Sequence, residues 1–277
     1  MKTLRKRRGP SLRAFVVVAF ALALASAPEA KADDAVALIW KGAKDQPTAE
    51  ALKPGWERLG KLLSDSGVVI PEGFPTLVQS STVSGLKPGF WVWVVGFCPA
   101  GEGGDALEQL KVVAPDTYAR DVKLPREKLA CPNVEAATLN ADSHTFKLPE
   151  GRVLRVFTYE ESEVPEGDMP GDEYTRTQYV FALMGKAGEV LDTVSAAGEE
   201  TFSGDVRNGP SGYSCLAPSI ARDNKGVVKF TRSCTATVAE CGSVVRGDEV
   251  TLITVDRTGM KSQEKRINEE RMECGGD

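Results

Sequence analysis

Hydrophobic positions in the first half of the chain form helix-like stripes and strand-like runs in turn. One stripe at helical spacing follows Pro54 and consists of Trp56, Leu59, Leu62 and Leu63. A second follows a capping-box-like Asp105 and Glu108 and consists of Leu107, Leu110 and Val113. Runs rich in β-branched and aromatic residues predict strands over Ala35–Trp40, Thr76–Val83, Phe90–Phe97 and Tyr118–Leu124. This β-α-β-β-α-β order predicts a ferredoxin-like sheet of four antiparallel strands with two helices on one face.

The strand predicted at Phe90–Phe97 is apolar on both of its sides. Alternation places on one face Trp91, Trp93, Val95 and Phe97, and on the other Phe90, Val92, Val94 and Cys98. An antiparallel sheet with one face in water alternates apolar with polar residues. We therefore expect both faces to be covered, one by helices and the other by the second half of the chain, a partner or a sugar ligand.

From His144 onward, short turns that end in glycine separate strand-like runs. The turns are Leu148–Gly151, Gly185–Gly188, Asp223–Gly226 and Asp256–Gly259, and each suits a type I turn with a glycine bulge. A propeller needs at least four blades of about 40–45 residues each, which this half of the chain is too short to supply. The pattern instead predicts an antiparallel sandwich or barrel of about eight strands. The polar segment Ser262–Glu273 fits either a strand or a helix.

The predicted fold class is therefore α+β, with an all-β second half. An α/β module is expected at residues 33–125, a linker at 126–141 and an antiparallel β domain with disulfides at 142–277. Residues 1–32 have the layout of a secretory signal peptide: a basic head, an apolar run at Ala14–Ala27, and Ala30-Lys31-Ala32 as a cleavage site. The apolar run is shorter than the roughly 20 residues that span a membrane.

Charge narrows the range of partners. Cleavage after Ala32 would leave 27 basic and 38 acidic residues, a formal charge of −11. Nucleic-acid phosphates and anionic lipids both need Lys or Arg on the protein, so we expect neither nucleic acid nor a membrane as partner. The export signal favours a periplasmic or secreted protein, and the net charge favours a monomer.

Six cysteines in an exported chain predict three disulfides. Spacing pairs Cys98 with Cys131 in the first half. In the second half, a plain two-residue turn at Asp223–Gly226 places Cys215 opposite Cys234, whereas a glycine-bulge register shifts the pairing by one and places Ile220 opposite Phe230. Cys215–Cys234 is the leading option, with Cys241–Cys274 as its companion. No C-x-x-C motif occurs, so neither a metal site nor a redox site is expected.

Few residues suggest catalysis. His144 is the single histidine, and its neighbours Asp142 and Ser143 are adjacent in sequence, which gives no triad geometry. The loop at Gly209-Pro-Ser211 lacks the context of a nucleophile elbow. The acidic stretch Glu160–Glu173 has no calcium-binding spacing. We expect no catalytic residue, no metal and no cofactor.

The segment Gly89–Phe97, together with the predicted element order and the size of the module, resembles a SPOR domain over residues 35–125. In that family an aromatic residue opens the third strand and a Val-x-Val-Gly-x-Phe pattern follows. SPOR domains bind septal peptidoglycan that has lost its stem peptides, so the resemblance implies glycan binding. The candidate glycan-binding residues are Trp91 and Trp93 on the third strand and the polar Gln79 and Ser81 on the second.

Three functions follow from these features. The first is a non-enzymatic cell-envelope protein that binds peptidoglycan glycan or an envelope protein. The second is a secreted enzyme that acts on polysaccharide through two carboxylates, which need not be close in sequence. The third is a structural or inhibitor-like secreted protein. Trp91 and Trp93 also fit a purely structural role, because large aromatic side chains dominate protein cores.

Overall fold

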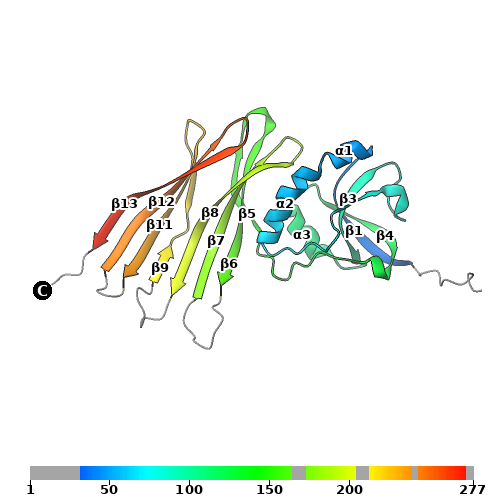
Figure 1. Cartoon of the computed structure of the whole chain (residues 1–277), viewed down its shortest axis with the longest axis horizontal. Coiled ribbons are helices and arrows are strands. Elements are labelled where there is room, and N and C mark those ends of the chain that lie inside the picture. Colours follow the sequence, from blue (N-terminus) through cyan, green and yellow to red (C-terminus); the bar gives the residue numbers. More distant parts are fainter. Residues whose placement is uncertain (1–31, 164–172, 204–211, 239–242, 273–277) are drawn as a thin grey trace, which may run out of the picture.

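The computed structural model describes residues 32–163, 173–203, 212–238 and 243–272. The predicted signal peptide, the loop at Gly209-Pro-Ser211 and the pair Cys241–Cys274 lie outside these residues, except that Ala32 begins the first strand. Within these residues the chain folds into two antiparallel sheets with helices between them (Figure 1).

The smaller sheet contains four strands in the order β2-β3-β1-β4. Its strands are β1 (Ala32–Ala43), β2 (Thr76–Gln79), β3 (Trp91–Pro99) and β4 (Tyr118–Pro125). Its helices are α1 (Gln46–Glu50), α2 (Lys53–Asp65) and α3 (Gly104–Val113). The short helix α1 was not predicted, and it begins where the Asp45 side chain accepts a hydrogen bond from the Thr48 N–H at 2.9 Å.

The larger sheet contains nine strands. Eight follow the order β13-β12-β11-β9-β8-β7-β6-β5, and β10 pairs with β11 beside β9. Their bounds are β5 (Asn140–Lys147), β6 (Val153–Glu163), β7 (Glu173–Met184), β8 (Val190–Ser203), β9 (Gly212–Cys215), β10 (Ser219–Arg222), β11 (Val228–Val238), β12 (Ser243–Val255) and β13 (Met260–Met272). The polar segment at the end of the chain is therefore a strand.

The predicted α+β fold class with a ferredoxin-like module is wrong, because strands make up 56% of the described residues and helices, 3-10 turns included, only 17%. The strands of the second half are much longer than their apolar runs. β8, for example, extends through the polar residues Gly198–Ser203, which continue to pair with β7. The helices also do not form the outer layer of a separate module, since they lie between the two sheets (Figure 1).

A single core joins the helices to both sheets. Trp40 of β1 packs edge to face on Trp56 of α2, with ring centroids 5.2 Å apart. The same cluster of buried side chains includes Phe157 of β6 and Val180 of β7. Across this layer the Arg58 side chain donates to the Val190 carbonyl at 3.3 Å. The second half of the chain therefore covers the helical face of the smaller sheet.

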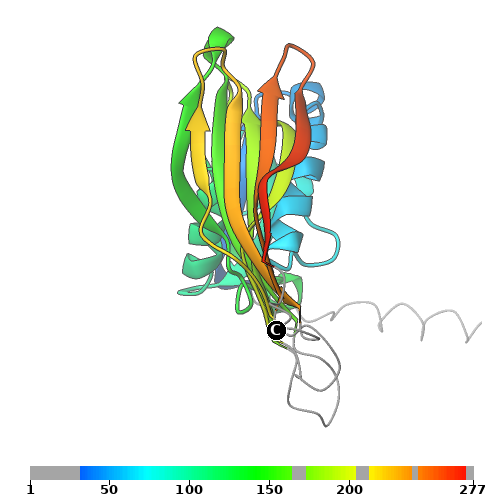
Figure 2. The same cartoon turned by 90° about the vertical axis from the view of Figure 1, so that its left-hand side faces the viewer.

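The larger sheet curls upon itself. Phe230 of β11 packs against Phe181 and Tyr179 of β7, with ring centroids 5.7 and 5.3 Å away, although β8 and β9 lie between these strands in the pairing order. The Met260 N–H of β13 donates to Asp192 of β8 at 2.7 Å. Within the described residues, the edge strands β5 and β13 each pair on one side only. The arrangement agrees with a sandwich-like packing of β strands and not with a closed barrel. Figure 2 shows the sheet face-on.

Candidate functional site

The predicted glycan-binding residues separate into buried and accessible positions. Trp93 is only 7% exposed, and its indole N–H donates to the Ala49 carbonyl at 2.7 Å. Trp93 is thus a core residue that a ligand does not reach. Trp91 is half-buried, and it lies directly opposite the exposed Gln79 on the adjacent strand β2. Directly opposed residues share a face of the sheet, so these two side chains are neighbours.

β2 ends at Gln79, so Ser81 lies in the following 3-10 turn Ser80–Thr82 and not on the strand where it was predicted. The N–H of Ser80 donates to the Phe90 carbonyl at 2.9 Å, and the Ser80 hydroxyl accepts from the Phe90 N–H at 3.1 Å. Ser80 is buried and Ser81 is exposed. Gln79, Ser81 and Trp91 are the accessible residues among those predicted to bind glycan, and together they are called the Trp91 surface.

The alternation predicted along β3 changes at Gly96. Trp93, Val95 and Cys98 belong to the core shared with the helices, whereas Val92, Val94 and Phe97 belong to the core on the opposite face. On the adjacent strand β1, Leu38 pairs with Gly96 and Ile39 pairs with Val94. Val95 is therefore an extra residue on β3, and the pairing register shifts there. Phe97 and Cys98 are consequently on the faces opposite to those predicted.

A second candidate site lies on the larger sheet. A cavity of about 540 Å³ extends from β7 to β13, and sequence reasoning did not identify it. It is called the charged cavity below, and its charged lining includes Arg176, Glu200, Arg232, Glu249, Glu264 and Arg266. These residues span 90 positions of the sequence, from Arg176 to Arg266, on five strands, so only the strand order brings them together.

Arg232 is the centre of the ion pairs in the charged cavity. Its Nη1 lies 2.7 Å from Glu200 Oε2, and its Nη2 lies 2.6 Å from Glu249 Oε2. The same Nη1 also donates to the Gly198 carbonyl at 3.2 Å. The side chains of Arg232 and Glu200 are each only 11% exposed, so solvent screens this ion pair weakly.

The outer groups continue the network in both directions. The Tyr174 hydroxyl donates to Glu200 Oε1 at 2.8 Å, and Arg266 Nε donates to Glu249 Oε1 at 3.1 Å. Burial, and then the hydrogen bond to Glu200, raises the pKa of Tyr174 to about 12. Tyr174 therefore stays neutral and acts as a hydrogen-bond donor at pH 7.

Glu249 stays ionised in this environment. Burial raises its pKa, but the hydrogen bond and the charge of Arg232, together with Arg266, outweigh burial and hold the pKa below its ordinary value of 4.5. A glycosidase needs one carboxylic acid with a raised pKa to protonate the leaving group. Glu249 is thus not suited to general acid catalysis.

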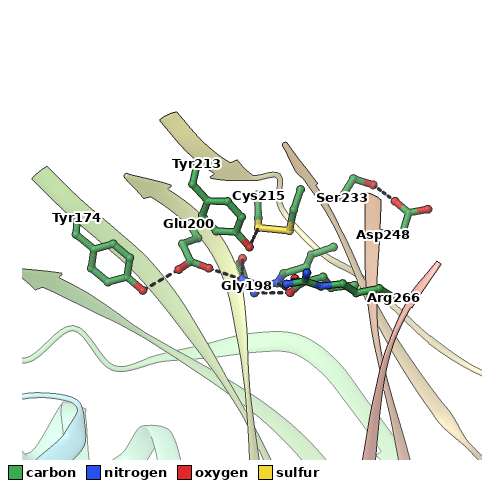
Figure 3. Close-up of a disulfide and its surroundings, with 11 residues drawn as sticks. Tyr174, Gly198, Glu200, Tyr213, Cys215, Ser233, Asp248 and Arg266 are labelled. Carbon is green, nitrogen blue, oxygen red and sulfur yellow. Dashed lines mark hydrogen bonds and ion pairs between the residues drawn. A yellow bond between two sulfur atoms is a disulfide. The ribbon is translucent and has the colours of Figure 1, made fainter. Parts of the chain in front are cut away.

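The structure contains the disulfide Cys98–Cys131, which was expected from spacing, and Cys215–Cys234, which was the leading option for the second half. Cys215 lies directly opposite Cys234, and Ile220 lies directly opposite Phe230, so both of the registers considered for this hairpin occur. A one-residue shift between β9 and β10 reconciles them. The Tyr213 hydroxyl lies 3.1 Å from Cys215 Sγ, beside the charged cavity (Figure 3).

The other predicted features carry no site in the described residues. His144 pairs with Asp142 two residues away and stacks on Phe146, on the strand β5 at the edge of the sheet. Most of the acidic stretch after Glu163 lies outside the described residues. Among those described, no group of three or more His, Cys, Asp or Glu residues is placed to hold a metal ion.

Two disulfides are compatible with a secreted or periplasmic protein, since such bonds persist in oxidising compartments. In the part of the chain that the structure describes, no helix is both long and apolar enough to cross a membrane. No protein-family model, no curated protein and no solved structure matches this chain.

Proposed function

We propose that the protein is an exported, non-enzymatic protein of the bacterial cell envelope that binds peptidoglycan glycan through the Trp91 surface. The observation that carries the proposal is the half-buried indole of Trp91 directly opposite the exposed amide of Gln79. An aromatic ring next to a hydrogen-bonding side chain suits a sugar, whose ring has an apolar face and polar edges.

Two further features support glycan binding. Residues 35–125 resemble a SPOR domain in the segment Gly89–Phe97, and that resemblance implies a glycan stripped of stem peptides. The calculated charge of the chain without residues 1–32 is strongly negative, which disfavours nucleic acid and anionic lipid as ligands. An envelope protein is the alternative occupant of the Trp91 surface.

The four tryptophans allow a direct test by fluorescence quenching. Trp40, Trp56 and Trp93 are no more than 7% exposed, so iodide in solution should quench Trp91 far more than the others. Solubilised glycan strands that cover Trp91 should reduce this quenching. Trp91→Phe should abolish the quenchable component and so identify its source.

A pair of variants separates specific from non-specific protection. Gln79→Ala should weaken the protection of Trp91 from iodide by glycan. Glu135→Ala changes an exposed residue outside the Trp91 surface and should leave this protection unchanged. Quenching of Trp91 that is unaffected by saturating glycan strands would show that the Trp91 surface does not bind glycan.

A further inference from the structure

The charged cavity has the dimensions and the lining of a ligand site. Its volume of about 540 Å³ lies within the roughly 300–1,000 Å³ that small-molecule sites occupy. Its wall contains three arginines, one lysine and three glutamates, and the aromatic side chains of Tyr213 and Phe230 also line it. It is formed by the larger sheet, whereas the Trp91 surface belongs to the smaller one.

The innermost charges of this cavity are fully engaged with one another. All three nitrogens of the Arg232 guanidinium donate to Glu200, Glu249 or the Gly198 carbonyl. Both oxygens of Glu249 accept from arginines. These groups form a rigid base that fixes the positions of the outer side chains, since moving any of them breaks several charge-assisted hydrogen bonds.

The outer charges retain free bonding capacity. Arg266 uses Nε and Nη2 on a single oxygen of Glu249, its side chain is 68% exposed, and its Nη1 has no hydrogen bond to a described residue. Arg176 likewise places Nε and Nη2 on one oxygen of Glu161. Glu264 is exposed, on the same strand as Arg266, and has no ion pair with a described residue.

We propose that the charged cavity binds a small organic carboxylate that also carries hydroxyl or ammonium donors. The ligand carboxylate accepts from the guanidinium groups of Arg266 and Arg176, whose planar N–H groups match a carboxylate. The neighbouring donors of the ligand bind Glu264. Lys265 also lines the cavity, so the outer cations outnumber the single anion Glu264 and favour a ligand whose net charge is negative or zero.

Two sources of this chemistry are distinguishable by experiment. One is the carboxyl end of a short peptide, and the other is a sugar acid. Isothermal titration calorimetry of the full oxidised chain would compare alanylalanine with its carboxyl amide, and glucuronate with glucose. Each comparison removes the carboxylate and keeps the remaining donors.

The expected result is heat of binding for at least one acid and at least a tenfold weaker affinity for its neutral counterpart, which corresponds to about 1.4 kcal/mol. The acid that binds more tightly identifies the source. Equal affinity for acid and neutral forms, or no binding of either acid at millimolar concentration, would overturn the proposal.

Two substitutions assign the binding to this cavity. Arg266→Gln should weaken the affinity of the protein for the acid by about tenfold, because one charge-assisted contact is lost. Arg257→Gln removes an equally exposed arginine from the β12–β13 turn, outside the cavity, and should change nothing. Glu264→Gln should weaken the affinity for a ligand that carries an ammonium group more than the affinity for a ligand that carries hydroxyl groups. Equal affinities in Arg266→Gln and Arg257→Gln would place the binding elsewhere.

Discussion

At the scale of single residues, Arg232 shows how a buried charge becomes part of the fold. Its guanidinium is held between Glu200 and Glu249, which are only 11% and 24% exposed. Burial lowers the pKa of Arg232, but its hydrogen bonds to Glu249 and Glu200 outweigh burial and raise it. The residue is permanently charged, and its removal would leave the buried Glu200 without a counter-charge and Glu249 with Arg266 alone.

Arg232→Met should therefore lower the free energy of unfolding by about 3 kcal/mol, the cost of leaving a buried ion pair incomplete. Urea unfolding at pH 7 measures this change. The control Arg257→Met alters an exposed turn residue and should change the free energy by less than about 0.5 kcal/mol. Similar values for the two variants would mean that the ion pairs contribute little to stability.

Glu249 gives stability a specific dependence on pH. Its folded-state pKa lies below the ordinary value of 4.5, so its contribution is fully present above that pH and is lost as the pH falls through the folded-state pKa. The free energy of unfolding of Glu249→Gln should accordingly fall less than that of the wild type between pH 7 and the acid range. Parallel pH profiles for both proteins would contradict this assignment.

At the scale of elements, the predicted alternation on β3 failed at the extra residue Val95, which is followed by the closely packed Gly96. A Cβ atom at this position would lie 2.7 Å from the Ala130 carbonyl oxygen and 2.7 Å from Pro132 Cδ. Phe97 exchanges backbone hydrogen bonds of 2.9 and 2.8 Å with Ala130, and the neighbouring Cys98 is bonded to Cys131. The segment around Cys131 thus covers β3 where the sheet lacks a side chain.

Gly96→Ala should displace this segment and lower the free energy of unfolding by about 2 kcal/mol, as other overpacked positions do. Gly104→Ala is the matched control, because a Cβ there meets nothing within 4 Å at the first turn of α3. Thermal or urea unfolding of both variants provides the comparison. A Gly96→Ala protein as stable as Gly104→Ala would refute the close approach at β3.

At the scale of the whole molecule, the two sheets share one core through the helices, so they should unfold together. All four tryptophans lie between Trp40 and Trp93, whereas most strand residues lie in the larger sheet. Tryptophan fluorescence therefore reports the first half of the chain, and far-ultraviolet circular dichroism reports mainly the second. The two urea transitions should coincide; separate midpoints would show that the halves unfold independently.

The sequence predicted local features better than global ones. The runs that become β1, β3 and β4, and the stripes of α2 and α3, are visible in hydrophobic spacing because one face of each element is buried. The length of β8 was not visible, because its polar end is held by pairing with β7 and not by burial. The charged cavity was also beyond prediction, since its arginines and glutamates look like ordinary solvated surface residues until the curl of the sheet brings them together.

Co-sedimentation with purified peptidoglycan sacculi tests the proposed function most directly. The oxidised protein should sediment with sacculi, and more of it should do so after an amidase has removed the stem peptides. The double variant Trp91→Ala, Gln79→Ala should lose this binding while it retains the unfolding transition of the wild type. Absence of the wild-type protein from the pellet with both forms of sacculi would contradict glycan binding.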